Sequence, residues 1–239
     1  MKIIADIGSN WNTLDDCLSA IENARISGID IVKFQFFTFQ KLYGCAGEME
    51  GELPESWIHI LSNKAHDIGL EFMCSVFDYA DVSYLDNYVD YHKIASSEAN
   101  DINICTKCLD TDKKVLFSTG AIPTDIAIHN CKKSNGRMIP MACISEYPAR
   151  HYPISTLKCF LENEIEIYGM SDHNNSDINI GMEIAEKMGC SFFEFHYNPF
   201  GIKSKDAGHS VEVFRRLNPL AYPLEYDTSK ARKPKWYRT

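Results

Sequence analysis

Residues 15–37, DDCLSAIENARISGIDIVKFQFF, contain one complete unit of the pattern that decides the fold. Apolar residues recur at helical spacing over Asp15–Ser27, Gly28 ends that segment, and the apolar run Ile31–Phe37 follows. An amphipathic helix followed by a short apolar run is typical of a βαβ unit, in which the parallel strand is buried. This stretch therefore predicts a helix, a turn and a buried strand.

The same unit recurs along the whole chain. The predicted strands are Ile3–Ile7, Ile31–Phe37, Glu71–Val76, Tyr91–Ala95, Val115–Ser118, Met138–Ile144, Ile165–Met170 and Ser191–Tyr197. The predicted helices are Asp15–Ser27, Pro54–Ile68, Tyr79–Asn87, Ile102–Leu109, Thr124–Lys133, Ser155–Glu162, Asp177–Met188 and Val211–Leu217. Eight strand–helix units close naturally into a (β/α)8 barrel, the TIM barrel, and 239 residues suit one such domain. An open doubly wound sheet is the alternative, but the sequence GSNWN after the first strand lacks its glycine-rich phosphate loop.

The barrel pattern covers residues 1–217, and residues 218–239 differ from it in composition. They contain three prolines and a basic end. So few residues cannot bury a core of their own. We expect one barrel domain followed by an irregular, basic, proline-containing tail.

Charge and cysteine usage limit the partners and the compartment. A net charge of −9 argues against a nucleic-acid binder, which needs a basic surface for the phosphate backbone. No apolar run approaches the roughly 18–20 residues that cross a bilayer, so we expect no membrane partner. Nine cysteines at scattered spacings indicate reduced thiols in a cytoplasmic protein. We interpret the CxxC pair Cys105 and Cys108 as two positions of one amphipathic helix rather than half of a zinc site.

Polar residues gather where the predicted strands end. In a barrel of this kind the carboxyl ends of the strands meet at one mouth, which holds the active site. The polar residues at these ends are Asp6, Asn10, Lys33, Gln35, Ser75, Asp78, Lys93, Ser96, Glu98, Ser118, Thr119, Ser145, Tyr147, Ser171, Asp172, His173, Glu194, His196 and Asn198. Every strand thus delivers a group that can bind a ligand or transfer a proton.

Lys33 and Lys93 lie within apolar runs, where an ammonium group is costly to bury without an anionic partner. A phosphate-bearing ligand would be such a partner, and serine hydroxyls with neighbouring backbone amides would complete its binding site. The serines in question are Ser75, Ser96, Ser118 and Ser171. The alternative is that each lysine pairs with a carboxylate inside the barrel, such as Glu98 or Glu194.

His173 and His196 follow or end the last two strands at matching depth. Two neutral imidazoles side by side are natural ligands for a divalent metal ion. Carboxylates that could orient the histidines or add oxygen ligands are Asp6, Asp172, Glu194 and Asp206. We interpret the six other histidines as surface or structural residues.

Six short segments resemble the sialic acid synthase (N-acetylneuraminate synthase) family, in the family's order and at barrel spacing. They are ADIGSN (5–10), VKFQ (32–35), KIASSE (93–98), STG (118–120), EYP (146–148) and GMSDH (169–173). The resemblance extends over about residues 2–217. It concerns the catalytic barrel of the family, and we expect this chain to lack the family's C-terminal antifreeze-like domain.

The resemblance implies that phosphoenolpyruvate condenses with an N-acyl hexosamine such as N-acetylmannosamine, or with a related aldose, giving a sialic-acid-type 2-keto acid and phosphate. It implies Mn²⁺ or Mg²⁺ on His173 and His196, and it is compatible with a homodimer. The residues that match the phosphoenolpyruvate site are Lys33, Ser75, Lys93, Ser96, Ser118 and Ser171. The residues assigned to the sugar are Asn10, Gln35, Tyr147 and Asp206, and those assigned to catalysis are Asp6, Lys93, Glu98 and Glu194.

Three positions depart from the family pattern. Asp6 stands where the family has a glutamate, Trp11 replaces a histidine, and Phe195 replaces a basic residue. These changes keep open a non-catalytic barrel that binds a phosphorylated ligand or a partner protein. A Schiff-base aldolase that uses Lys93 or Lys33 as its nucleophile is a further alternative.

Overall fold

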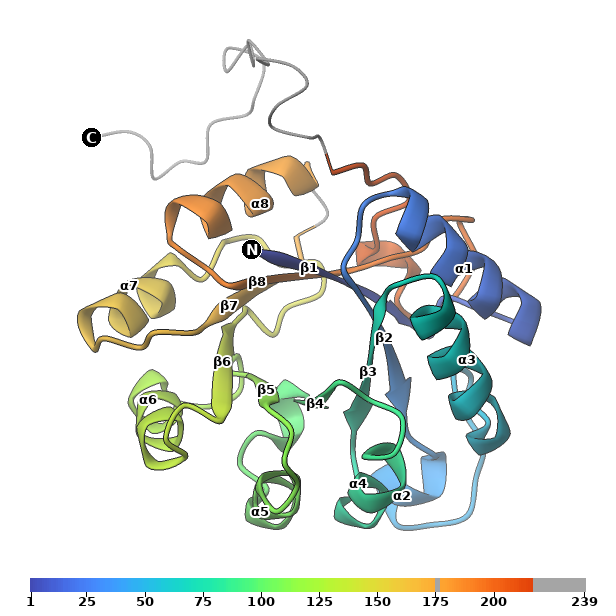
Figure 1. The fold of residues 1–239 in the computed structure, drawn as a ribbon, viewed down its shortest axis with the longest axis horizontal. Coiled ribbons are helices and arrows are strands. Elements are labelled where there is room, and N and C mark those ends of the chain that lie inside the picture. The colour runs from blue at the N-terminus through green and yellow to red at the C-terminus, as the bar shows by residue number, and fades with distance from the viewer. Residues whose placement is uncertain (175–176, 217–239) are drawn as a thin grey trace, which may run out of the picture.

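The computed structural model describes residues 1–174 and 177–216, so the expected tail, 218–239, lies outside the described residues. Eight parallel strands pair in chain order, and β8 pairs with β1 to close the barrel. Figure 1 shows the strands at the centre and the helices around them. The predicted (β/α)8 barrel is confirmed.

The element bounds follow the sequence pattern closely. The strands are β1 (Lys2–Gly8), β2 (Ile31–Phe36), β3 (Glu71–Val76), β4 (Tyr91–Ile94), β5 (Val115–Ser118), β6 (Met138–Ala142), β7 (Gly169–Asp172) and β8 (Phe192–His196). The helices are α1 (Leu14–Ile26), α2 (Phe39–Tyr43), α3 (Glu55–Asp67), α4 (Tyr79–Leu85), α5 (Ile102–Leu109), α6 (Thr124–Lys133), α7 (Ile154–Glu162) and α8 (Ile178–Lys187), with short 3₁₀ turns η1 (Ser96–Glu98) and η2 (Ala207–His209). Within the described residues, no helix is both long enough and apolar enough to cross a membrane.

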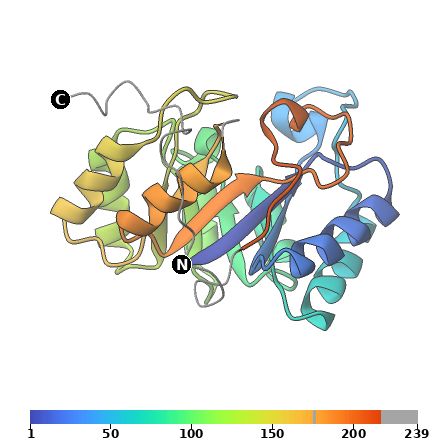
Figure 2. The same cartoon turned by 90° about the horizontal axis from the view of Figure 1, so that it is seen from above.

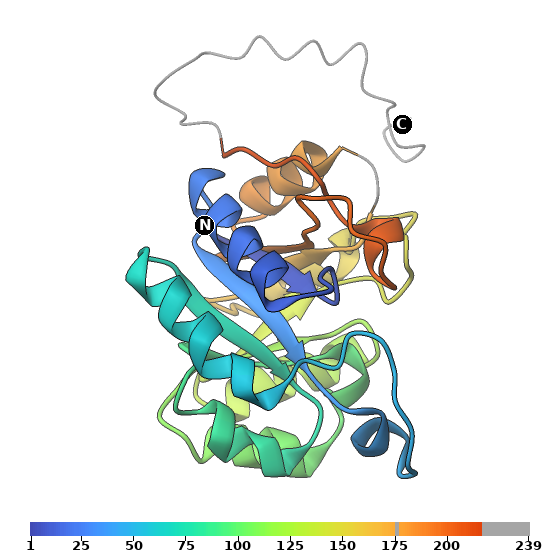
Figure 3. The ribbon, with the colours of Figure 1, turned by 90° about the vertical axis from the view of Figure 1, so that its right-hand side faces the viewer.

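Local signals explain where several helices begin. Thr13 caps α1 with a reciprocal capping box, in which its side chain accepts from the backbone of Asp16 while the Asp16 carboxylate accepts from the backbone of Thr13. The short helix α2, which the sequence pattern did not predict, begins at Thr38, whose side chain accepts a hydrogen bond from the backbone of Lys41. Figures 2 and 3 place α2 and η2 at the same end of the barrel, where the strands finish.

The predicted helix Val211–Leu217 is wrong over the described residues, because 211–216 contain no helix. Val211 instead pairs with Tyr197 just beyond β8. The ring of Phe214 packs on that of Phe195, with centroids 4.9 Å apart. The apolar spacing that was interpreted as helical therefore serves to extend the pairing past β8 and to cover the outside of the barrel.

Two-residue alternation along the strands divides the interior of the barrel into layers. An apolar cluster, which we call the floor, fills the amino-terminal end. The floor consists of Ile4, Ile31, Met73, Leu116, Ile139, Met141 and Phe192. On five strands the residue two positions after a floor residue lines a cavity at the opposite end, and these five are Asp6, Lys33, Ser75, Ser118 and Glu194. One continuous set of inward-facing positions thus changes from apolar to polar or charged within a single step of the alternation.

The outward faces of the strands pack against the helices in a second, larger core. Cys105 and Cys108 belong to it, because both are buried residues of α5. Their interpretation as two positions of an amphipathic helix is confirmed.

Candidate active site

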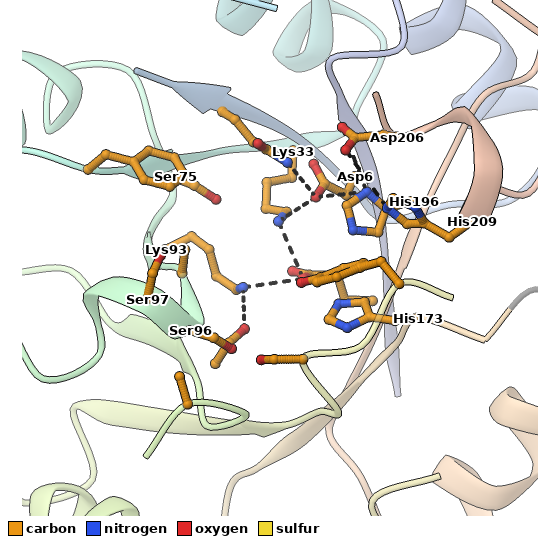
Figure 4. Close-up of a pocket in the computed structure, with 18 residues that line it drawn as sticks. Asp6, Lys33, Ser75, Lys93, Ser96, Ser97, His173, His196, Asp206 and His209 are labelled. Atoms are coloured by element: carbon orange, nitrogen blue, oxygen red, sulfur yellow. Dashed lines mark hydrogen bonds and ion pairs between the residues drawn. The ribbon is translucent and has the colours of Figure 1, made fainter. Parts of the chain in front are cut away.

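A cavity of about 530 Å³ opens at the carboxyl ends of the strands, and we call this region the mouth. Each strand, or the loop that follows it, contributes to its wall, and Figure 4 shows these side chains turned toward one another. The lining residues are Asp6, Lys33, Gln35, Ser75, Phe77, Lys93, Ala95, Ser96, Ser97, Ser118, Ala121, Ser145, Tyr147, His173, Glu194, His196, Asp206 and His209. This volume is in the range of small-molecule sites.

Two lysines and two carboxylates form one buried network in the mouth. Lys33 Nζ lies 2.8 Å from Asp6 Oδ2 and 3.3 Å from Glu194 Oε1. Lys93 Nζ lies 3.2 Å from the same Glu194 oxygen and donates a hydrogen bond to Ser118 Oγ at 2.8 Å. The carboxylate pairing that the sequence left open is thus present for Glu194. The two positive charges and the two negative charges neutralise each other, and this pairing offsets the cost of removing the four groups from water.

The network lowers the pKa of some of its members and raises the pKa of others. Burial alone would raise the pKa of Glu194, but the ammonium groups of Lys33 and Lys93 outweigh it and hold that pKa far below its usual range. Burial alone would lower the pKa of Lys33, yet Asp6 and Glu194 raise it. Burial prevails at Lys93 and lowers the pKa of its ammonium group, although Glu194 opposes the shift. Lys93 is therefore the lysine that gives up its proton more readily.

His173 and His196 lie side by side, with ring centroids 5.5 Å apart. His173 Nδ1 is 2.7 Å from the carbonyl oxygen of Ile144, which can only accept, so Nδ1 carries the proton and Nε2 keeps its lone pair. Burial, helped by neighbouring His196, lowers the pKa of His173 to about 3. The imidazole is therefore neutral and suited to bind a metal ion.

The loop after β8 adds two further groups, Asp206 and His209. Asp206 was expected at the sugar. His209 was interpreted as a surface or structural residue, and the structure shows that it is buried and lines the mouth. The ligand-type atoms of His196, Asp206 and His209 all lie within 4.8 Å of one another. The spacing of Asp206 and His209 is the one signal that could have found the pair, because residues three apart in a 3₁₀ turn share a face.

Three predicted site residues do not line the mouth. Asn10 is buried beside it, where its amide nitrogen donates to the carbonyl oxygen of Tyr197 at 3.1 Å and to Ser210 Oγ at 3.0 Å. Glu98 ends the turn η1, whose other members, Ser96 and Ser97, are the ones that face the cavity. Ser171 is buried on β7 next to Glu194 and donates to Glu194 Oε1 at 2.9 Å.

The departures at Trp11 and Phe195 lie away from the mouth. The Trp11 indole donates to the carbonyl oxygen of Gly8 and packs edge-on against Trp57 of α3. Phe195 faces outward from β8, where it contacts Phe214. Neither side chain lines the cavity, so these two substitutions leave its described wall unchanged.

Fold and cavity together define a class of protein. It is a closed parallel barrel that gathers ammonium groups, carboxylates, hydroxyls and imidazoles at the end where barrel enzymes bind their substrates. The particular family follows from the sequence. The chain belongs to the NeuB family, whose model matches residues 20–215.

Relatives of known name agree with this assignment. The N,N'-diacetyllegionaminic acid synthase of Legionella pneumophila is 27% identical over 230 residues, which cover 82% of this chain and 63% of that protein. The pseudaminic acid synthase of Helicobacter pylori is 26% identical over 223 residues, covering 82% and 65%. The chain therefore spans less than two thirds of the length of these two relatives. The resemblance to the sialic acid synthase family is confirmed.

A solved structure shows the same fold. The N-acetylneuraminic acid (sialic acid) synthetase from Leptospira borgpetersenii, crystallised in complex with citrate, superimposes with a TM-score of 0.78 at 24% identity. The match covers 88% of this chain and 78% of that one. This likeness supports the barrel and the order of its strands.

Proposed function

We propose that the protein condenses phosphoenolpyruvate with an N-acyl hexosamine or a related aldose, and releases phosphate and a sialic-acid-type 2-keto acid. The observation that carries the proposal is the joint presence of Lys33, Lys93, His173 and His196 on one cavity. Membership of the NeuB family supports the reaction class. N-Acetylmannosamine is the first acceptor to test.

We assign phosphoenolpyruvate to the half of the mouth formed by Lys33 and Lys93. The two ammonium groups would attract the phosphate and the carboxylate of phosphoenolpyruvate. These anionic groups must compete for the lysines with Asp6 and Glu194. The hydroxyls of the neighbouring strands and of the turn η1 would donate to the remaining oxygens. These hydroxyls belong to Ser75, Ser96 and Ser118, and the hydrogen bond from Ser171 would hold Glu194 in place.

We assign the acceptor and a divalent ion, Mn²⁺ or Mg²⁺, to the opposite half. The residues there fit an ion, because His173 presents a lone pair at Nε2 and His196 Nδ1 is buried with no hydrogen-bond partner among the described residues. His173 and His196 would hold it, with Gln35, Tyr147 and Asp206 facing the sugar. Such an ion supplies Lewis acidity at the acceptor's aldehyde oxygen.

The bond changes balance with these groups alone. The methylene carbon of phosphoenolpyruvate forms the new C–C bond to the aldehyde carbon, and the aldehyde oxygen takes up a proton. Water adds its oxygen to the former enol carbon, and cleavage of the C–O bond to phosphate leaves the keto group. Asp6, whose Oδ1 is buried without a hydrogen-bond partner in the described part of the chain, or Glu194 would take one proton of the water, which ends on the former aldehyde oxygen. The second water proton leaves with the phosphate as the keto group forms.

The test is incubation of the full chain with phosphoenolpyruvate, Mn²⁺ and a panel of aldoses, followed by phosphate assay and product mass. The panel contains N-acetylmannosamine, a diamino sugar and a shorter aldose. We expect phosphate release only when both metal and one sugar are present. His173→Ala and His196→Ala should abolish it, whereas His129→Ala, on the exposed side of α6, should not. Ligand binding without turnover over the whole panel would instead indicate a non-catalytic barrel.

One observation favours a second reaction, a Schiff-base aldolase. Burial lowers the pKa of Lys93, which is what a nucleophilic lysine needs. Borohydride reduction in the presence of pyruvate would then attach the carbon skeleton to Lys93, and peptide mass mapping would locate it. We expect no adduct, because Lys93 Nζ is occupied by Ser118 and Glu194.

A further inference from the structure

The mouth contains a third histidine that the proposed function does not use. His209 comes from the turn η2, and its ring lies next to two rings of the site: the centroid distances are 4.4 Å to His196 and 4.8 Å to Tyr147. Tyr147 in turn lies against His173, at 4.4 Å. Three imidazoles therefore surround one tyrosine at the opening, with His196 between the other two in Figure 4.

Asp206 is fixed in this cluster by contacts with β1 and the turn after it. Its Oδ2 accepts hydrogen bonds from the backbone amide of Ser9 at 3.0 Å and from the Ser9 hydroxyl at 2.9 Å. The approach requires a glycine at position 8, because a Cβ on Gly8 would lie 2.5 Å from that same oxygen. Asp206 Oδ1 is the oxygen nearest to His209 Nε2, at 3.8 Å.

The nitrogens that face Asp206 are buried and unsatisfied. His196 Nδ1 and His209 Nε2 have no hydrogen-bond partner within residues 1–174 and 177–216, and both residues are more than nine-tenths buried. His196 Nδ1 lies 4.0 Å from Asp206 Oδ2. Distances of this size are too long for hydrogen bonds. They suit donors around one ion, since two atoms each about 2.1 Å from a metal lie up to about 4.2 Å apart.

We propose that His209 is a metal ligand, which with His196 and Asp206 adds an imidazole to the site and makes it select transition-metal ions over Mg²⁺. The inference rests on the proposed function, because it concerns the ion of the same mouth. With His173, the site then offers three imidazoles and one carboxylate, which leave further positions of a six-coordinate ion open for substrate oxygens. Imidazole nitrogen favours Zn²⁺ and related ions, whereas Mg²⁺ prefers oxygen ligands.

The experiment measures metal binding without substrate. The metal-free full chain is titrated calorimetrically with Zn²⁺, Mn²⁺ or Mg²⁺, and electron spin-echo spectroscopy of the Mn²⁺ form counts the bound imidazole nitrogens. We expect the wild-type chain to bind Zn²⁺ more tightly than Mg²⁺. His209→Ala should weaken Zn²⁺ binding at least about tenfold, leave Mg²⁺ binding nearly unchanged and remove one coordinated nitrogen. The matched control is His129→Ala, the loss of an exposed histidine of α6.

Two further comparisons distinguish a loss of metal binding from a loss of folding, and a failure of this inference from a failure of the proposed function. His209→Gln preserves the size of the side chain, and the metal-free melting temperatures of both variants show whether they fold. Unchanged Zn²⁺ affinity and an unchanged nitrogen count in His209→Ala would overturn the role of His209. If His173→Ala and His196→Ala still lost the ion, the proposed function would remain. A wild-type chain that bound no ion would overturn both.

Discussion

The two ends of the barrel interior are built from the same strands and have opposite properties. The floor consists of apolar side chains only, all buried. The mouth places two lysines, two aspartates, a glutamate and three histidines around one cavity. Of the seven buried side-chain atoms without a hydrogen-bond partner in the described residues, four belong to the mouth, on Asp6, Glu194, His196 and His209. We therefore expect the floor to contribute mainly to stability, and the polar atoms of the mouth that lack a partner to contribute mainly to ligand binding.

Removal of one mouth charge should give the largest effect, and it should fall on activity. Lys93→Met leaves Glu194 paired with Lys33, so no buried carboxylate loses its last cation. We expect kcat/KM to fall at least about a thousandfold, while the free energy of unfolding falls by no more than about 3 kcal/mol, because Lys33 still pairs with Glu194. Steady-state kinetics and urea unfolding check the two halves of this prediction. A large loss of stability with activity intact would reverse the comparison.

A cavity in the floor should lower stability and leave activity nearly unchanged. Leu116→Ala removes a fully buried side chain from the floor and should lower the free energy of unfolding by about 3 kcal/mol. The kcat of the molecules that remain folded should stay within about twofold of the wild type. Leu116→Met, which keeps the volume, should cost less than about 1.5 kcal/mol. Denaturant melts of the three proteins provide the measurement.

Gly8 is the last residue of β1, the strand that carries Asp6, and it packs closely against Asp206 in the loop after β8. Gly8→Ala adds a methyl group 2.5 Å from Asp206 Oδ2 and demands a φ of +53° from alanine. We expect a stability cost of about 1–2 kcal/mol together with about tenfold weaker metal binding. Gly44→Ala is the matched control, because its φ is +69° but no atom lies within 4 Å. It should share the backbone cost and leave metal affinity unchanged.

The smallest effect should come from His92, which lies on β4 next to Lys93 but belongs to the outer core. Burial lowers the pKa of His92, against the pull of Asp86 at 2.9 Å. The unfolded chain therefore takes up this proton first, and stability must fall as the pH drops below about 6.5. His92→Gln should flatten the slope by up to about 1.4 kcal/mol per pH unit. Equal slopes for the two proteins, measured by urea unfolding across this range, would contradict the shift.

The fold and most of the mouth could be predicted from the sequence because both depend on local rules. The alternation along each strand already predicts that Asp6, Lys33 and Glu194 point inward. Closure of the barrel then brings the carboxyl ends of their strands together. The alternation stops where a strand ends, and two of the three predicted site residues that do not line the cavity lie beyond that point. These two are Asn10, which follows β1, and Glu98, which follows β4.

The sequence analysis missed His209 because the position of its loop depends mainly on distant contacts. The loop that carries it is held by Asn10, which bonds to Ser210 from 200 positions earlier in the chain, and by Ser9, which bonds to Asp206. No local pattern encodes such contacts. The same holds for Val211 and Phe214, whose helical spacing is overridden by pairing with Tyr197 and packing on Phe195.

The most direct test of the account follows the bridging oxygen of phosphoenolpyruvate, the one that joins carbon to phosphorus. The full chain is given phosphoenolpyruvate labelled isotopically at this oxygen, together with Mn²⁺ and the acceptor aldose, and both products are weighed. The account predicts that the label leaves with phosphate, that the keto acid takes its new oxygen from water, and that no phosphate appears without the aldose. Label retained in the keto acid, or phosphate released without an aldose, would contradict it.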